Sequence, residues 1–126
     1  MSFVPIRVSS RATHQAPASV AILRRYDGEY CDFRFAPSTL RAAGWHRGTR
    51  ISPFLDLEAG ELMFATAGQS DPHARSLTSQ GGHQLSARWS RVAEFRSVIP
   101  DLSSRRRLRL IRAGEGQVVL DLAQLA

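Results

Sequence analysis

The basic residues are the side chains of this sequence best suited to chemistry, and all 17 of them are Arg. A guanidinium group is planar and always charged, and it binds phosphate or carboxylate through two parallel N–H donors. The formal net charge is +6, and residues 88–112 hold eight Arg against only Glu94 and Asp101. This uneven charge indicates an anionic partner, either nucleic acid or the acidic face of another protein.

The most basic segment is SSRRRLRLIR, residues 103–112. Its three adjacent residues Arg105, Arg106 and Arg107 precede an alternating run that is typical of a strand, so the charge would lie at one end of a hairpin. One interpretation is a rim that binds phosphate groups. The other is a charged sheet edge that discourages pairing with other chains.

Candidates for catalysis or metal binding are weak, so we expect no enzyme activity, no cofactor and no metal. No two of the four His have the spacing of helical metal ligands, and all lie in polar or loop contexts: His14, His46, His73 and His83. The single cysteine, Cys31, lacks a partner for a disulfide or zinc site, and we expect it to be buried. Trp45 and Trp89 could stack on bases, but Trp45 follows a Gly that ends a helix and Trp89 falls in an apolar register, so core packing is favoured.

The elements that must position the Arg residues are two hairpins and a short helix. Residues 20–35 predict a hairpin with a turn at Asp27 and Gly28, because Cys31, Phe33 and Phe35 alternate with polar residues. Pro37 can open a helix that Gly44 ends. Residues 55–64 predict a second hairpin around the turn EAGE.

The chain length of 126 residues corresponds to one ordinary domain, or to two small units that share a core. We expect an N-terminal strand and polar arm (1–19), a first unit (20–67), a linker (68–82) and a second, degenerate unit (83–126). With an offset of 56 residues, Gly116 falls on Gly60 and the order strand, short helix, hairpin recurs. A chance similarity between small sheet segments is the alternative.

The run APSTLRAAGWHRGTRISPFLDLEAGELMFA, residues 36–65, resembles the swapped-hairpin family of AbrB and SpoVT type regulators. That family's signature is a strand ending in Pro, a short helix with an apolar residue and Arg, two Gly, and then a hairpin. The residues that fill these places in order are Pro37, Leu40, Arg41, Gly44, Gly48 and Ile51.

The resemblance implies a sheet-dominated α+β fold, a small barrel of two pseudo-repeated swapped-hairpin units. It also implies a DNA-binding transcriptional regulator that presents Arg from its first strands to duplex DNA. On this basis the further candidate residues are Arg24, Arg25, Arg34, Arg88 and Arg91. These Arg residues could instead be solvated, or could pair with Asp27, Glu29 and Asp32. A homodimer or a higher oligomer is compatible with the family.

The alternative function is a small phage-borne or plasmid-borne inhibitor, such as an anti-CRISPR-like or other anti-defence protein. It would bind an acidic or nucleic-acid-binding site of a host protein complex. No apolar run is long enough to span a bilayer and the N-terminus lacks a secretory signal pattern, so we expect a cytoplasmic protein without a membrane partner.

Overall fold

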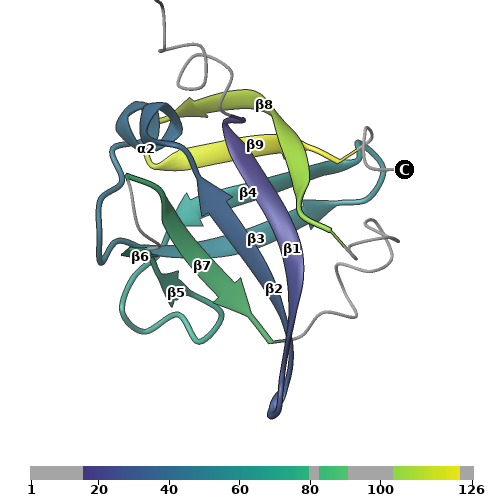
Figure 1. The fold of residues 1–126 in the computed structure, drawn as a ribbon. Coiled ribbons are helices and arrows are strands. Elements are labelled where there is room, and N and C mark those ends of the chain that lie inside the picture. The colour runs from purple at the N-terminus through teal and green to yellow at the C-terminus, as the bar shows by residue number, and fades with distance from the viewer. Residues whose placement is uncertain (1–15, 80–82, 91–103, 123–126) are drawn as a thin grey trace, which may run out of the picture.

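The computed structural model describes residues 16–79, 83–90 and 104–122, and these form an antiparallel sheet with one short helix (Figure 1). The sheet-dominated α+β class expected from the sequence is therefore confirmed at this level. The strands are β1 (Ala18–Arg25), β2 (Gly28–Phe35), β3 (Arg50–Asp56), β4 (Glu61–Thr66), β5 (Arg75–Ser76), β6 (Thr78–Ser79), β7 (Leu85–Trp89), β8 (Arg106–Gly114) and β9 (Gln117–Asp121), and the helix is α2 (Pro37–Ala43).

The β1–β2 hairpin forms as predicted, and its tip projects beyond the rest of the sheet (Figure 1). The two strands pair along their whole length, and the turn lies at Tyr26 and Asp27, one residue before the predicted position. Gly28 follows this turn as the first residue of β2 with a φ of 135°, a conformation that glycine reaches without steric cost. Cys31, Phe33 and Phe35 are fully buried on the inner face of β2. Asp32 and Arg34 point to the outer face by the two-residue period of a strand.

The helix α2 begins at Pro37 and ends at Gly44, as predicted. Proline suits the first turn because its missing N–H would have no helical partner there. Gly44 adopts a left-handed φ of 75° and its N–H donates to the Arg41 carbonyl. The Ala43 carbonyl then accepts from the N–H of Gly116 at 3.0 Å, which places the end of α2 at the β8–β9 turn.

The sheet has the order β5-β3-β4-β9-β8-β1-β2-β7-β6, so its two edges are β5 and β6. These edge strands are consecutive in the chain and are separated only by Leu77. The Leu77 N–H and carbonyl also bond to the Thr49 carbonyl and the Gly48 N–H, both at 2.9 Å. The chain itself therefore joins the two edges, which makes the sheet a nearly closed barrel and leaves little edge exposed.

Aromatic side chains fill the centre of this barrel. The Phe64 ring centroid lies 4.9 Å from that of Phe33 and 5.3 Å from that of Phe35, both in edge-to-face geometry. Trp45 and Trp89 are buried and pack against these rings, so the predicted core role of both tryptophans is confirmed. Each indole N–H has a partner, Thr66 Oγ1 for Trp45 and the His73 carbonyl for Trp89.

Two strand pairs each contain a pair of opposed residues that are 56 positions apart in the sequence. β2 and β7 pair with Asp32 opposite Arg88, residues that are 56 apart. β4 and β9 pair with Met63 opposite Val119, which have the same separation. Each pairing therefore contains one pair of opposed residues that the 56-residue offset makes equivalent.

Two backbone hydrogen bonds across the hairpin turns follow the same offset. The N–H of Thr66 donates to the Gly116 carbonyl, and the N–H of Leu122 donates to the Gly60 carbonyl, both at 2.8 Å. Gly60 and Gly116 both have positive φ, 66° and 77°. The contacts of one hairpin with the other are thus reciprocal.

Residues 68–82, expected to be a linker, contain β5 and β6 and so also contribute to the sheet. Their apolar periodicity is weak because each of these strands is only two residues long. The predicted N-terminal strand within 1–19, and the second short helix that the 56-residue offset predicts at residues 91–99, lie outside the described residues, except that β1 already begins at Ala18.

Candidate nucleic-acid interface

A buried carboxylate organises the outer face of the sheet. Asp32 has 0% exposure although it points away from the barrel core, between β1 and β7. Its register partners are Ala21 on β1 and Arg88 on β7. Burial of an unpaired charge is costly, so this carboxylate requires cationic or hydrogen-bonding partners.

Three guanidinium groups supply those partners. Asp32 Oδ1 accepts from Arg88 Nε at 3.0 Å, and Oδ2 accepts from Arg34 Nε at 3.3 Å and from Arg105 Nη2 at 2.5 Å. The three Arg side chains are 32%, 37% and 27% exposed for Arg34, Arg88 and Arg105. Asp32, Arg34, Arg88 and Arg105 are called the Asp32 cluster below.

Neighbouring strands hold the Asp32 cluster in place. Arg105 Nη1 also donates to Ser19 Oγ on β1 at 3.1 Å and to the Asp32 carbonyl at 3.4 Å. Ser19 on β1 pairs with Arg34 on β2 and with Arg107 on β8, so these three residues form one row across the outer face of the sheet. The next row on the same face contains Asp32 and Arg88. The two rows place basic side chains from β2, β7 and the start of β8 on one surface.

The Asp32 cluster carries an excess of positive charge, because three guanidinium groups surround one carboxylate. Arg34 and Arg88 both use Nε for Asp32, and the described residues offer no further partner to their terminal nitrogens. Those nitrogens can donate outward to an anion. A carboxylate beneath the surface thus allows guanidinium groups to lie together despite their mutual repulsion, and leaves them able to bind phosphate.

The remaining predicted residues lie in other places. Arg24 and Arg25 are exposed near the tip of the β1–β2 hairpin, and Arg24 Nε lies 3.6 Å from Glu29 Oε1. Arg106 is exposed at the start of β8, opposite Val20, and Arg91 lies outside the described residues. The structure therefore brings together Arg34, Arg88 and Arg105. The alternative that such residues pair with acidic neighbours is confirmed for Arg24, Arg34 and Arg88.

Sequence analysis missed the central role of Asp32, which it treated as one acidic neighbour among three. A signal was present, since the 56-residue offset aligns Asp32 with Arg88.

Two side chains near these strands have raised pKa values. On the inner face, burial raises the pKa of the Cys31 thiol to about 12, and the nearby Asp32 charge adds to this effect. At the hairpin tip, the hydrogen bond to Asp27 raises the pKa of the Tyr30 phenol.

Metal ligation finds no support in the part of the chain that is described, where no group of three His, Cys, Asp or Glu side chains converges. Within the same residues, no helix has the length and apolar character needed to cross a membrane. The fold and the surface define a small antiparallel barrel with an Arg-rich outer face. No family model, no curated protein and no solved structure matches this chain.

Proposed function

We propose that the protein is a DNA-binding transcriptional regulator whose Asp32 cluster contacts backbone phosphates of duplex DNA. The observation that carries this proposal is the convergence of Arg34, Arg88 and Arg105 on one buried carboxylate, with donors left over on the outer face. Contacts from Arg to phosphate position a protein on DNA, and bidentate contacts to guanine edges add sequence preference.

The proposed architecture is a swapped-hairpin barrel in which 20–67 and 83–126 are equivalent units. It is supported by the pairing of Asp32 with Arg88 and of Met63 with Val119, all related by the 56-residue offset. In this arrangement, Asp32 and Arg88 lie beside a pseudo-twofold axis. A surface centred on such an axis suits DNA, because the two strands of the duplex are also related by twofold symmetry.

The salt dependence of DNA affinity tests this function. Fluorescence anisotropy with random duplex DNA between about 50 and 200 mM salt should give a slope of log K against log salt of about −2 to −3, since each neutralised phosphate contributes roughly −0.9. A slope near zero would exclude DNA binding through this surface.

A protein partner is the second candidate, and exposed apolar side chains favour it. Phe54 on β3 is 51% exposed and Leu57 in the following turn is 65% exposed. An inhibitor of a host complex should retain one stoichiometric protein partner after nuclease treatment. Phe54→Ser should abolish that capture, whereas Arg34→Gln should not if the apolar surface is the interface.

A further inference from the structure

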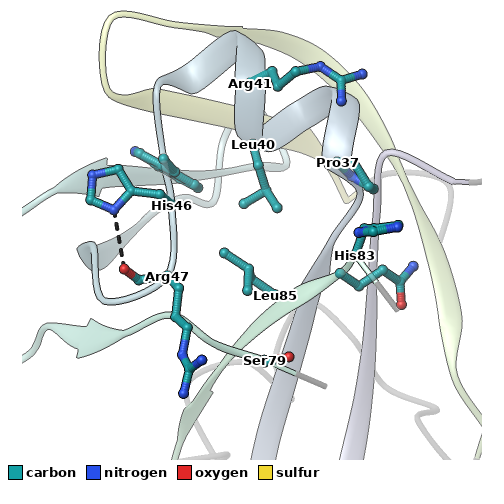
Figure 2. A pocket seen from close by; sticks show the side chains of 10 residues that line it. Pro37, Leu40, Arg41, His46, Arg47, Ser79, His83 and Leu85 are labelled. Carbon is teal, nitrogen blue, oxygen red and sulfur yellow. Dashed lines mark hydrogen bonds between the residues drawn. The ribbon is translucent and has the colours of Figure 1, made fainter. Parts of the chain in front are cut away.

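A pocket of about 570 Å³ opens between α2, the loop 44–49 and the start of β7 (Figure 2). None of its lining residues belongs to the Asp32 cluster. Its volume lies in the range of small-molecule sites, about 300 to 1,000 Å³. The pocket is therefore a separate place at which this protein can bind a ligand.

The described side chains around the pocket have one sign of charge. Arg41 and Arg47 line it together with His46 and His83, and no Asp or Glu is among the described residues that line it. The guanidinium groups of Arg41 and Arg47 have no partner among the described residues. A site lined by unpaired cations and lacking carboxylates favours an anion.

The centre of the pocket is apolar. Leu40 from α2 and Leu85 from β7 face each other in the middle of Figure 2, and His46 and His83 lie on either side of them. The buried Trp45 completes this apolar part. A ligand that uses the whole pocket therefore needs an apolar body as well as an anionic group.

The wall that carries Arg47 is held in place by the backbone. The N–H of Thr49 donates to the His46 carbonyl at 3.0 Å, and the N–H of His46 donates to Thr49 Oγ1 at 3.0 Å. Gly48 and Thr49 are bonded in turn to Leu77. A tight turn attached to the residue that links β5 and β6 presents a preformed site, which reduces the entropy lost on binding.

We propose that this pocket binds a small organic anion, in which an apolar body rests on Leu40 and Leu85 and a phosphate or carboxylate group bonds to Arg41 or Arg47. Both anionic groups accept two parallel hydrogen bonds from a guanidinium, so the shared chemistry defines the ligand class. This inference does not depend on DNA binding, because the Asp32 cluster contributes nothing to the pocket.

Calorimetric titration of the full chain tests the ligand class with four probes: phenyl phosphate, benzoate, inorganic phosphate and phenol. We expect phenyl phosphate or benzoate to bind at least about tenfold more tightly than both inorganic phosphate and neutral phenol, because only they combine the two required groups. The tighter of the two identifies the anionic group. Equal affinities for all four probes, or no binding at all, would overturn the proposal.

Two variants connect binding to this pocket. Arg41→Gln or Arg47→Gln, or both, should weaken binding of the better organic probe by about tenfold, the effect of one lost charge-assisted hydrogen bond. Arg112→Gln, an exposed residue on β8 that does not line the pocket, is the matched control and should bind as the wild type does. The same loss in all three variants, or in none, would contradict the proposal. The salt dependence of DNA affinity is measured on the same proteins. A failure of ligand binding in this pocket can then be distinguished from a failure of DNA binding at the Asp32 cluster.

Discussion

Asp32 and Arg88 lie directly opposite each other on β2 and β7, and Arg88 Nε donates to Asp32 Oδ1 at 3.0 Å. The same carboxylate also accepts from Arg34 and Arg105, so one residue joins two strands and the segment that enters β8. This contact both stabilises the outer face of the barrel and gathers its positive charge.

Replacement of Asp32 by Asn should destabilise the protein. The amide has nearly the same shape, but it removes the charge that three guanidinium groups share and introduces N–H donors toward them. Because the Arg side chains are partly exposed and partly solvated, we expect a loss of about 2–3 kcal/mol in the free energy of unfolding, below the cost of breaking a fully buried pair. Urea denaturation measures this loss.

Glu58→Gln is the matched control for Asp32→Asn, because it removes the same charge at an exposed site in the β3–β4 turn. Its effect should stay within about 0.5 kcal/mol. If the two variants were equally stable, Asp32 would not organise the cluster.

Loss of Arg34 and Arg88 should weaken DNA binding. In the double variant Arg34→Gln and Arg88→Gln, two outward-facing cations are gone, so the salt slope should become less negative by about 1.8. Circular dichroism verifies that the variant is folded. Arg112→Gln serves as the control, since it lies roughly 20 Å along β8 from Arg105 at the strand rise per residue. Equal salt slopes in the double variant and in Arg112→Gln would show that the DNA contacts lie on another surface.

Gly116→Ala should destabilise the protein more than Gly44→Ala. The two glycines have similar φ values, 77° and 75°, so both substitutions carry the left-handed backbone penalty of about 1–2 kcal/mol. Among the described residues, a Cβ added at Gly44 would meet no atom, whereas one added at Gly116 would meet Thr66 Oγ1 at 2.8 Å, which also accepts the Trp45 indole N–H. Chemical denaturation should therefore show an additional loss of about 1 kcal/mol or more for Gly116→Ala. Equal losses would mean that the turn moves aside freely.

The Cys31 thiol should lower stability at alkaline pH. Its pKa is raised from 9.0 to about 12 in the folded protein, so between these values the unfolded chain loses the proton while the folded protein keeps it. The free energy of unfolding then falls as pH rises, by up to about 1.4 kcal/mol per pH unit. Below pH 9 the thiol is protonated in both the folded and the unfolded state, so the stabilisation by the buried neutral thiol is fully present.

Comparison of the wild type with Cys31→Ala at pH 8, 9, 10 and 11 isolates the thiol, because the raised pKa of Tyr30 affects both proteins alike. The stability advantage of the wild type should shrink with pH. Parallel curves would contradict the assignment. Native protein should also resist thiol-specific reagents that label the unfolded chain, since a buried neutral thiol is a poor nucleophile.

The sequence predicted those parts of the fold that depend on neighbouring residues. The alternation of Cys31, Phe33 and Phe35 determines which face of β2 is buried, because successive side chains of a strand point to opposite sides. Pro37 and Gly44 delimit α2 through their own backbone preferences. The core position of Trp45 followed from its place after the helix-ending Gly44, and that of Trp89 from the apolar register of its strand.

Tertiary structure alone decided which distant residues meet. Asp32 acquires Arg88 and Arg105 through the register of β2 with β7 and through the position of β1 beside β8, and strand register depends on the packing of the whole barrel. The basic pocket arises in the same way, because the pairing of Phe35 with Leu85 brings the start of β7 beside α2, and the backbone of Leu77 holds the loop 44–49. Local patterning determined the elements and their buried faces, whereas the long-range pairing of the strands placed the charged residues together. The reason is that only a packed core selects one register among several with the same two-residue period.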